Sequence, residues 1–197
     1  MNTNSTLPQI YLVRHGETAW TVSGQATGRT DIGLTDQGER DAQELVPRLK
    51  GLNFVQVLTS PLQRARRTAE LAGFGKFAEI DPDLVEWDYG AYEGRRTVDI
   101  RAERPGWRLL ENGCPGGEML ETVSSRAENV IERIRMLQGD SLIFAHRDIL
   151  RVLTARWLRL HAVEARNFYL STASVSILGY HHDLGEPVIR LWNDARH

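Results

Sequence analysis

The chain has 197 residues, of which 41% are hydrophobic, and its formal net charge is -2. A chain of this length forms one domain with a sizeable core, and its small net charge gives no sign of a nucleic-acid or membrane partner. Cys114 is the only cysteine, so no intramolecular disulfide forms, as is usual in a reducing compartment. Residues 1–8 are polar, and no apolar run reaches the roughly 20 residues that span a bilayer. We therefore expect a single cytoplasmic domain over residues 1–197.

The first apolar segment, residues 10–13, ends on Arg14 and His15, and Gly16 follows. A short apolar run with a β-branched residue at each end is typical of a buried strand in a parallel sheet. Ligands of open α/β sheets bind at the carboxyl ends of the strands, so we expect both side chains at a binding site. Arginine offers a fork of donors for phosphate or carboxylate, and histidine is a nucleophile or base near neutral pH. Taken alone, the pair also fits a solvated arginine and a structural histidine.

Two further strand ends carry basic residues. Residues 54–59 read as a second strand, and Ser60 and Pro61 favour a helix start with the serine as N-cap. Arg64 then falls in the first helical turn, beside the strand end, where helix N-termini bind anions. Residues 141–145 read as a third strand, which ends on His146. We therefore expect these side chains to meet those of the first strand end.

The remaining elements complete an α/β pattern. We expect a loop over residues 21–34, a helix over 35–49 that Pro47 kinks, a short strand over 78–80, helices over 97–104 and 123–137, and strands over 174–180 and 188–192. Residues 84–94 are acidic, aromatic and rich in glycine, which favours a ligand-facing loop. Residues 87–138 are expected to form a mostly helical cap insertion over the site.

Three strings of the sequence resemble one known family. Residues 10–18 read Ile-Tyr-Leu-Val-Arg-His-Gly-Glu-Thr, residues 60–69 read Ser-Pro-Leu-Gln-Arg-Ala-Arg-Arg-Thr-Ala, and residues 84–94 read Leu-Val-Glu-Trp-Asp-Tyr-Gly-Ala-Tyr-Glu-Gly. These strings are similar to the motifs of the histidine phosphatase superfamily, which includes cofactor-dependent phosphoglycerate mutases and many small phosphatases. The resemblance covers nearly the whole chain and implies a three-layer α/β/α sandwich around a mostly parallel sheet.

The resemblance also implies roles for the site residues. His15 would be phosphorylated during turnover, Arg64 would bind phosphate, and Glu86 would be the general acid. Arg14 and a protonated His146 would supply further positive charge to the phosphoryl group without a metal.

Further positions align with substrate contacts in the family. Thr27 and Gly28 match a loop that touches phosphate or substrate, and Tyr89 matches a substrate-contacting tyrosine of the mutases. Thr21 lies where mutases usually have asparagine, and Thr97 lies where they place a substrate lysine. Because the long arginine-bearing insertion of the mutases is also missing, the sequence looks closer to small acid phosphatases and sugar-bisphosphate phosphatases. We expect a phosphatase of small phosphorylated metabolites, with a phosphoglycerate mutase as the alternative.

One departure from the family pattern follows the second histidine, where a glycine is usual. Here Arg147 and Asp148 follow His146. The Arg147 backbone N–H is expected to contact phosphate while its side chain reaches solvent, whereas Asp148 could repel an anion. A phosphate- or partner-binding protein with weak catalysis therefore remains a second alternative.

No metal or cofactor is expected, because the four remaining histidines have no spacing typical of a zinc site: His161, His181, His182 and His197. The expected partner is a small phosphorylated substrate, with no nucleic acid and no membrane. A homodimer is left open.

Overall fold

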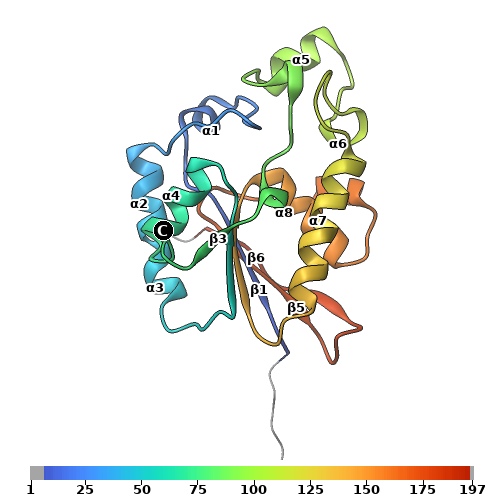
Figure 1. The fold of residues 1–197 in the computed structure, drawn as a ribbon. Helices are drawn as coiled ribbons and strands as arrows, with labels where there is room; N and C mark the ends of the chain where they lie inside the picture. Colours follow the sequence, from blue (N-terminus) through green and yellow to red (C-terminus); the bar gives the residue numbers. More distant parts are fainter. Residues whose placement is uncertain (1–6, 196–197) are drawn as a thin grey trace, which may run out of the picture.

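The computed structural model describes residues 7–195, which fold around one six-stranded sheet (Figure 1). The strands lie in the order β3-β2-β4-β1-β5-β6. The first four of these run parallel, and β5 and β6 are antiparallel additions at one edge. Their bounds are β1 Ile10–Arg14, β2 Gln56–Thr59, β3 Ala78–Ile80, β4 Ser141–Ala145, β5 Val175–Tyr180 and β6 Pro187–Asp194.

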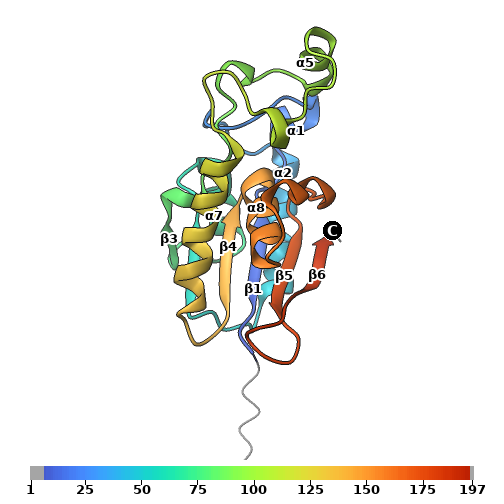
Figure 2. The same cartoon turned by 90° about the vertical axis from the view of Figure 1, so that its right-hand side faces the viewer.

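Helices cover both faces of the sheet (Figure 2). They are α1 Ala19–Ser23, α2 Asp36–Gln43, α3 Leu45–Leu49, α4 Gln63–Leu71, α5 Thr97–Glu103, α6 Leu109–Asn112, α7 Leu120–Arg135 and α8 Arg147–Trp157, with short 3₁₀ turns η1 Pro82–Leu84, η2 Gly90–Tyr92 and η3 Ala162–Asn167. No helix within residues 7–195 has the length and apolarity needed to cross a bilayer.

Alternating side chains of the central strands supply two cores. Tyr11 and Val13 face the α3 and α4 side, where they pack with Leu45 and Ala69. Ile10 and Leu12 belong to the other cluster, which includes the apolar faces of α7 and α8. Since successive strand side chains point to opposite faces, a continuous apolar strand requires a helical layer on each side. The predicted α/β/α sandwich is confirmed.

The segment beyond the carboxyl ends of the strands holds α5, α6 and their loops, which project above the sheet (Figures 1 and 2). Helix α7, although inside the predicted 87–138 insertion, packs along α8 and forms part of the layer over the sheet. Its apolar side chains Val123, Ala127 and Val130 are fully buried there. The projecting part is therefore shorter than the predicted insertion.

Two predicted helices begin or break at other residues. The helix over 35–49 breaks at Glu44, and Pro47 lies in the first turn of α3, where proline removes no helical hydrogen bond. Helix α4 begins at Gln63 with the extended Leu62 as N-cap, not at Ser60. The Ser60 hydroxyl contacts His146 and the Leu62 N–H instead.

Candidate active site

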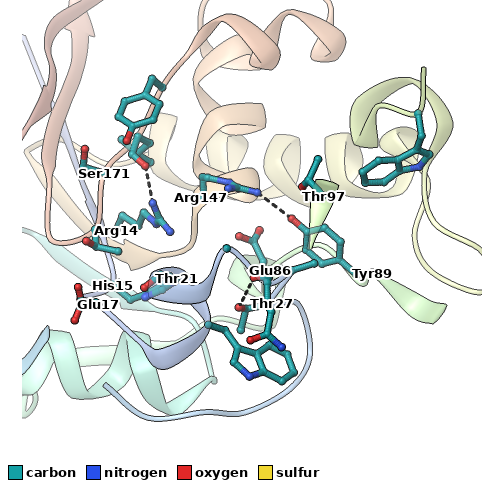
Figure 3. A pocket seen from close by; sticks show the side chains of 18 residues that line it. Arg14, His15, Glu17, Thr21, Thr27, Glu86, Tyr89, Thr97, Arg147 and Ser171 are labelled. Carbon is teal, nitrogen blue, oxygen red and sulfur yellow. Dashed lines mark hydrogen bonds between the residues drawn. The ribbon is translucent and has the colours of Figure 1, made fainter. Parts of the chain in front are cut away.

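A cavity of about 400 Å³ opens above the carboxyl ends of β1 and β4 (Figure 3). Backbone hydrogen bonds bring the strand ends together: His15 N–H donates to Ala145 O at 3.0 Å, and Ser60 N–H donates to Phe144 O at 3.0 Å. The charged and titratable side chains that line the cavity are Arg14, His15, Glu17, Glu86 and Arg147, and the aromatic ones are Trp20, Tyr89, Trp107 and Tyr169. A cavity of this size suits a small organic molecule.

His15 is buried and has one ring nitrogen fixed by the backbone. Its Nδ1 lies 2.7 Å from the carbonyl oxygen of Gly16. A carbonyl oxygen only accepts, so Nδ1 carries the proton and Nε2 keeps a lone pair. Burial, Arg14 and Arg64 hold the pKa of His15 well below its usual value. The ring is therefore neutral near pH 7 and can act as a nucleophile.

Gly16 lets the loop after β1 approach α2 closely. A Cβ at this position would lie 2.4 Å from the carbonyl oxygen of Gly38. Only a residue without a side chain fits there.

Arg14 points into the cavity with an incomplete set of partners. Its Nη1 donates to Leu170 O at 2.6 Å, whereas its buried Nε has no hydrogen-bond partner in the part of the chain that the structure describes. Burial and the charge of Arg147 lower the pKa of Arg14 to about 10, so it remains a cation at neutral pH. A buried unpaired donor on a cation favours an anionic ligand at this point.

Arg64 and His146 lie beside His15 beneath the cavity. The rings of His15 and His146 are 5.2 Å apart, and the Nε of the fully buried Arg64 donates to His146 Nδ1 at 3.1 Å. The other Arg64 bonds go to backbone carbonyls of Thr27, Gly28 and Thr30. Neither side chain belongs to the cavity lining identified within residues 7–195.

The predicted protonated state of His146 is wrong for this structure. Because Nδ1 accepts from Arg64, the ring proton sits on Nε2, which donates to Ser60 Oγ at 2.7 Å. Burial and the Arg64 charge also hold the pKa of His146 well below its usual value. His146 therefore positions Arg64 and Ser60 as a neutral ring.

Glu86 enters the cavity from the loop after η1 and is 4% exposed. Its carboxylate accepts backbone N–H bonds from Asp148 at 3.0 Å, Ile149 at 3.1 Å and Trp87 at 3.0 Å, so the first turn of α8 holds it in place. Burial and the charge of Asp148 raise its pKa, and these N–H bonds only partly oppose the rise. A carboxyl group with a raised pKa can act as a proton donor near neutral pH.

The predicted substrate contacts divide into two groups. Thr21, Thr27 and Tyr89 line the cavity. Gly28 does not, because its N–H donates to Glu93 Oε1 at 2.7 Å and its carbonyl accepts from Arg64. A Cβ on Gly28 would lie 2.2 Å from Trp87 O, so packing explains this glycine.

The side chain of Arg147 lies across the mouth of the cavity, contrary to the expected outward direction. Its Nη2 contacts the Tyr89 hydroxyl (Figure 3). It also contacts Asp148, and 46% of the side chain is exposed. The buried Asp148 carboxylate faces these groups rather than His15, since Tyr89 OH donates to it at 2.5 Å. No sequence pattern indicated that Arg147 and Asp148, the two departures from the family pattern, contact each other.

Several other cavity residues were not predicted from the sequence. Tyr169, Leu170, Ser171 and Thr172 come from the segment between η3 and β5, which carries no motif. Trp107 lines the cavity from the loop between α5 and α6. Only tertiary packing brings these segments to the strand ends.

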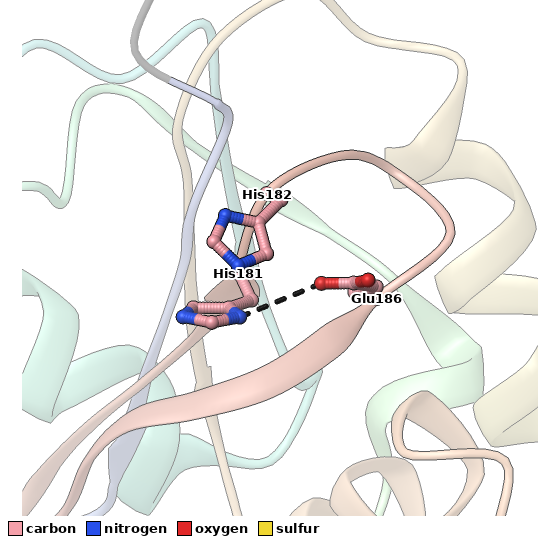
Figure 4. A group of neighbouring side chains, drawn as sticks. All are labelled: His181, His182 and Glu186. Carbon is pink, nitrogen blue, oxygen red and sulfur yellow. Dashed lines mark ion pairs between the residues drawn. The ribbon is translucent and has the colours of Figure 1, made fainter.

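A separate cluster of metal-ligand side chains lies at the β5–β6 turn (Figure 4). One ligand atom each of His181, His182 and Glu186 lie within 4.8 Å of one another, and all three residues are exposed. These donor types suit a divalent transition-metal ion. The sequence analysis did not predict the cluster because it considered histidine spacing, whereas the hairpin brings Glu186 back beside His181. In β5 the register places Val175 beside Val13 but Leu178 beside Ile10, so this turn is at the opposite end of the sheet from the cavity.

Sequence comparison identifies the family. Residues 10–195 match the model of the "Histidine phosphatase superfamily (branch 1)". An acid phosphatase of Mycobacterium tuberculosis (strain ATCC 25618 / H37Rv) is 39% identical over 179 residues, 88% of this chain and 87% of the relative. A protein of Cronobacter sakazakii named "Probable phosphoglycerate mutase GpmB" is 36% identical, with 87% of this chain and 85% of the relative covered. Sedoheptulose 1,7-bisphosphatase of Saccharomyces cerevisiae is 30% identical, with 95% and 93% covered.

A solved structure has the same fold. The product of an open reading frame of Mycobacterium tuberculosis superposes with a TM-score of 0.88 at 34% identity, covering 95% of this chain and 97% of that one. The resemblance drawn from the three motif strings is thus confirmed over the full domain. The chain therefore belongs to the histidine phosphatase superfamily.

Proposed function

We propose that this protein hydrolyses small phosphomonoesters, sugar phosphates among them, through a phosphohistidine formed at His15. The acid phosphatase and the sugar bisphosphatase among its relatives support hydrolysis of small phosphorylated metabolites. The observation that carries the proposal is the meeting of three groups in one cavity: the free Nε2 of His15, the unpaired Nε of Arg14 and the Glu86 carboxyl group.

The first step transfers the phosphoryl group to the enzyme. Nε2 of His15 attacks phosphorus, the bond to the leaving oxygen breaks, and Glu86 donates its proton to that oxygen. Arg14 stabilises the charge on the phosphoryl oxygens, and Arg64 beneath His15 adds a second fixed positive charge. We also propose that Arg64 and His146 contact the phosphoryl group directly.

The second step returns the enzyme to its starting state. Glu86, now ionised, takes a proton from water, and the oxygen of that water attacks the phosphohistidine. The nitrogen–phosphorus bond breaks and inorganic phosphate leaves. Thr21, Thr27, Tyr89 and Arg147, which line the cavity, would contact the bound substrate.

Rapid mixing with p-nitrophenyl phosphate tests the covalent route. We expect a burst of nitrophenol and, with radiolabelled phosphate in the substrate, an acid-labile label on His15. His15→Ala should lose both, whereas the exposed His161→Ala should keep both. Turnover that survives in His15→Ala would contradict the covalent route.

A phosphoglycerate mutase is the second candidate because the Cronobacter relative carries that name. The cavity argues against it, since Thr97 lines the wall at the position where the mutases have a substrate lysine. A binding protein with weak catalysis is less well supported, because the Asp148 carboxylate is tied to Tyr89 and arginines instead of facing the phosphate site.

We also propose that the protein acts in the cytoplasm on a small-molecule substrate without nucleic acid, and that a homodimer is its form if it assembles. The net charge of -2 supports the absence of a nucleic-acid partner. Sedimentation of the pure protein tests the assembly state.

A further inference from the structure

Arg147 is held across the cavity mouth with part of its guanidinium unused. Its Nε contacts Asp148 Oδ1 at 3.3 Å, and its Nη2 contacts Asp148 Oδ2 and the Tyr89 hydroxyl, both at 3.2 Å. Within residues 7–195 no hydrogen bond involves Nη1. The guanidinium is therefore fixed in orientation but keeps free donors.

The anchor of Arg147 is a buried ionised carboxylate. The Asp148 side chain is 1% exposed and also accepts from Arg151 Nη1 at 2.8 Å and from Tyr89 OH at 2.5 Å. Burial raises the pKa of Asp148, but Arg147 and Arg151 outweigh it and lower the pKa below its usual value. One negative charge thus stands between two positive charges, which leaves a net positive charge at the cavity mouth.

This positive charge lies beside the group that protonates the leaving oxygen. Arg147 and Tyr89 flank Glu86 on the cavity wall (Figure 3), and Glu86 is the group that protonates the leaving oxygen. Arg14, which adjoins His15 and has the buried unpaired Nε, already serves the transferred phosphoryl group. A second cation beside Glu86 is therefore available to the rest of the substrate.

We propose that Arg147 forms a subsite for a second anionic group, carboxylate or phosphate, on the leaving part of the substrate. The preferred substrates are then phosphomonoesters that carry such a group within reach of the cavity mouth. This inference rests on the proposed phosphatase function. Asp148 and Arg151 are positioning residues that keep the guanidinium turned toward the cavity.

Matched substrate pairs measure the subsite directly. Glycerol 3-phosphate and 3-phosphoglycerate differ by a hydroxymethyl group against a carboxylate, and fructose 6-phosphate and fructose 1,6-bisphosphate test a second phosphate. The readout is phosphate release, as the ratio of kcat/KM between the members of each pair. Charge-assisted hydrogen bonds are strong enough for Arg147→Gln to lower at least one ratio by about 10- to 100-fold.

The matched control is Arg29→Gln. Arg29 is 44% exposed in its side chain, close to the 46% of Arg147, and it pairs with Glu118 outside the cavity lining. We expect this variant to keep both ratios. Arg147→Lys, which retains charge without the planar fork, should lie between wild type and Arg147→Gln.

The outcomes separate the two proposals. If the unmodified protein releases no phosphate from any of the four compounds or from p-nitrophenyl phosphate, the phosphatase function fails and this inference fails with it. If the protein is active but Arg147→Gln lowers kcat/KM equally within both pairs, Arg147 acts on the transferred phosphoryl group and the second-anion subsite is overturned. Unchanged ratios in a folded Arg147→Gln overturn it as well.

A measurement on the unmodified protein removes the dependence on variant folding. Glycerate, the carboxylate product, should inhibit p-nitrophenyl phosphate hydrolysis at least tenfold more strongly than glycerol if the subsite takes carboxylate. Inorganic phosphate and glycerate, added together, test whether the cavity has two anion sites. If it has two, each compound should still bind in the presence of the other. Equal inhibition by glycerate and glycerol, with equal kcat/KM within both pairs, would refute the proposal.

Discussion

The Nε–H of Arg64 donates to Nδ1 of His146 across 3.1 Å, and both side chains are fully buried. A histidine that accepts from a guanidinium cannot carry a proton on the same nitrogen, so the positive charge of this pair belongs to Arg64 alone. In the free protein the second histidine is thus a neutral link between Arg64 and Ser60.

The neutral state of His146 should appear as a pH dependence of stability. Its folded pKa lies well below the usual 6.5, so between these two values the unfolded chain binds more protons than the folded chain. Stability then rises with pH in this window and is lost as pH falls through it. His146→Gln, which keeps an acceptor for Arg64, should remove up to about 1.4 kcal/mol per pH unit from the slope. Urea unfolding from pH 4.5 to 7.5 measures this change.

The control for that slope is the exposed His161→Gln. We expect its slope to equal that of the unmodified protein. A slope that His146→Gln leaves unchanged would mean that His146 binds its proton equally well in the folded and unfolded chains, which would contradict the lowered pKa.

Glu86→Gln should slow the first chemical step by about 10²–10⁴-fold, the usual contribution of a general acid. Glutamine can accept the N–H bonds of Asp148 and Ile149 but has no acidic proton to give. The loss should be smallest for p-nitrophenyl phosphate, whose leaving group departs as a stable anion. Steady-state kinetics with p-nitrophenyl phosphate and glycerol 3-phosphate make the comparison, and the same loss for both would exclude Glu86 as the acid.

Activity should be unaffected by EDTA, and vanadate should inhibit as a mimic of the five-coordinate phosphoryl group. In the proposed mechanism, Arg14 and Arg64 supply the positive charge that Mg²⁺ gives in other phosphoryl-transfer enzymes. The His181–His182–Glu186 cluster lies at the far end of the sheet from the cavity. Removing an ion from this cluster should therefore not change the reaction at His15. Activity lost in EDTA and recovered with Mg²⁺ would contradict this mechanism.

Net hydrolysis should exceed phosphoglycerate interconversion. Thr97 in the cavity wall offers no cation where the mutases have a lysine. An assay with 3-phosphoglycerate, primed with 2,3-bisphosphoglycerate, follows released phosphate and 2-phosphoglycerate together. Faster formation of 2-phosphoglycerate than of phosphate would favour the mutase.

The sequence could predict the strands and the meeting of the basic strand ends because these follow from local patterns, and the family resemblance implied the layers. The β4 bounds and the approach of His15 to His146 are examples. The direction of Arg147 could not be predicted in this way. It depends on Tyr89, which is far away in the chain and supplies a partner at the cavity mouth. The same holds for His146, whose charge state depends on its bond with Arg64 rather than on its own motif.

Asp148 connects the cavity mouth to the proton donor, and Asp148→Asn should reveal the connection. The negative charge of Asp148 raises the pKa of Glu86, and the charge of Arg147 lowers it. Removing the carboxylate deletes the first effect and leaves the second less compensated, so both changes lower the Glu86 pKa. Glu86 must be protonated to serve as the acid, and the alkaline limb of the kcat profile should therefore move to lower pH.

Profiles of the variant and the unmodified protein with glycerol 3-phosphate measure the shift, and thermal unfolding confirms that the variant is folded. The control is Asp99→Asn at a half-buried position, which breaks a pair with Arg96 and should leave the limb in place. A limb that moves to higher pH in Asp148→Asn would show that Asp148 does not hold the proton on Glu86.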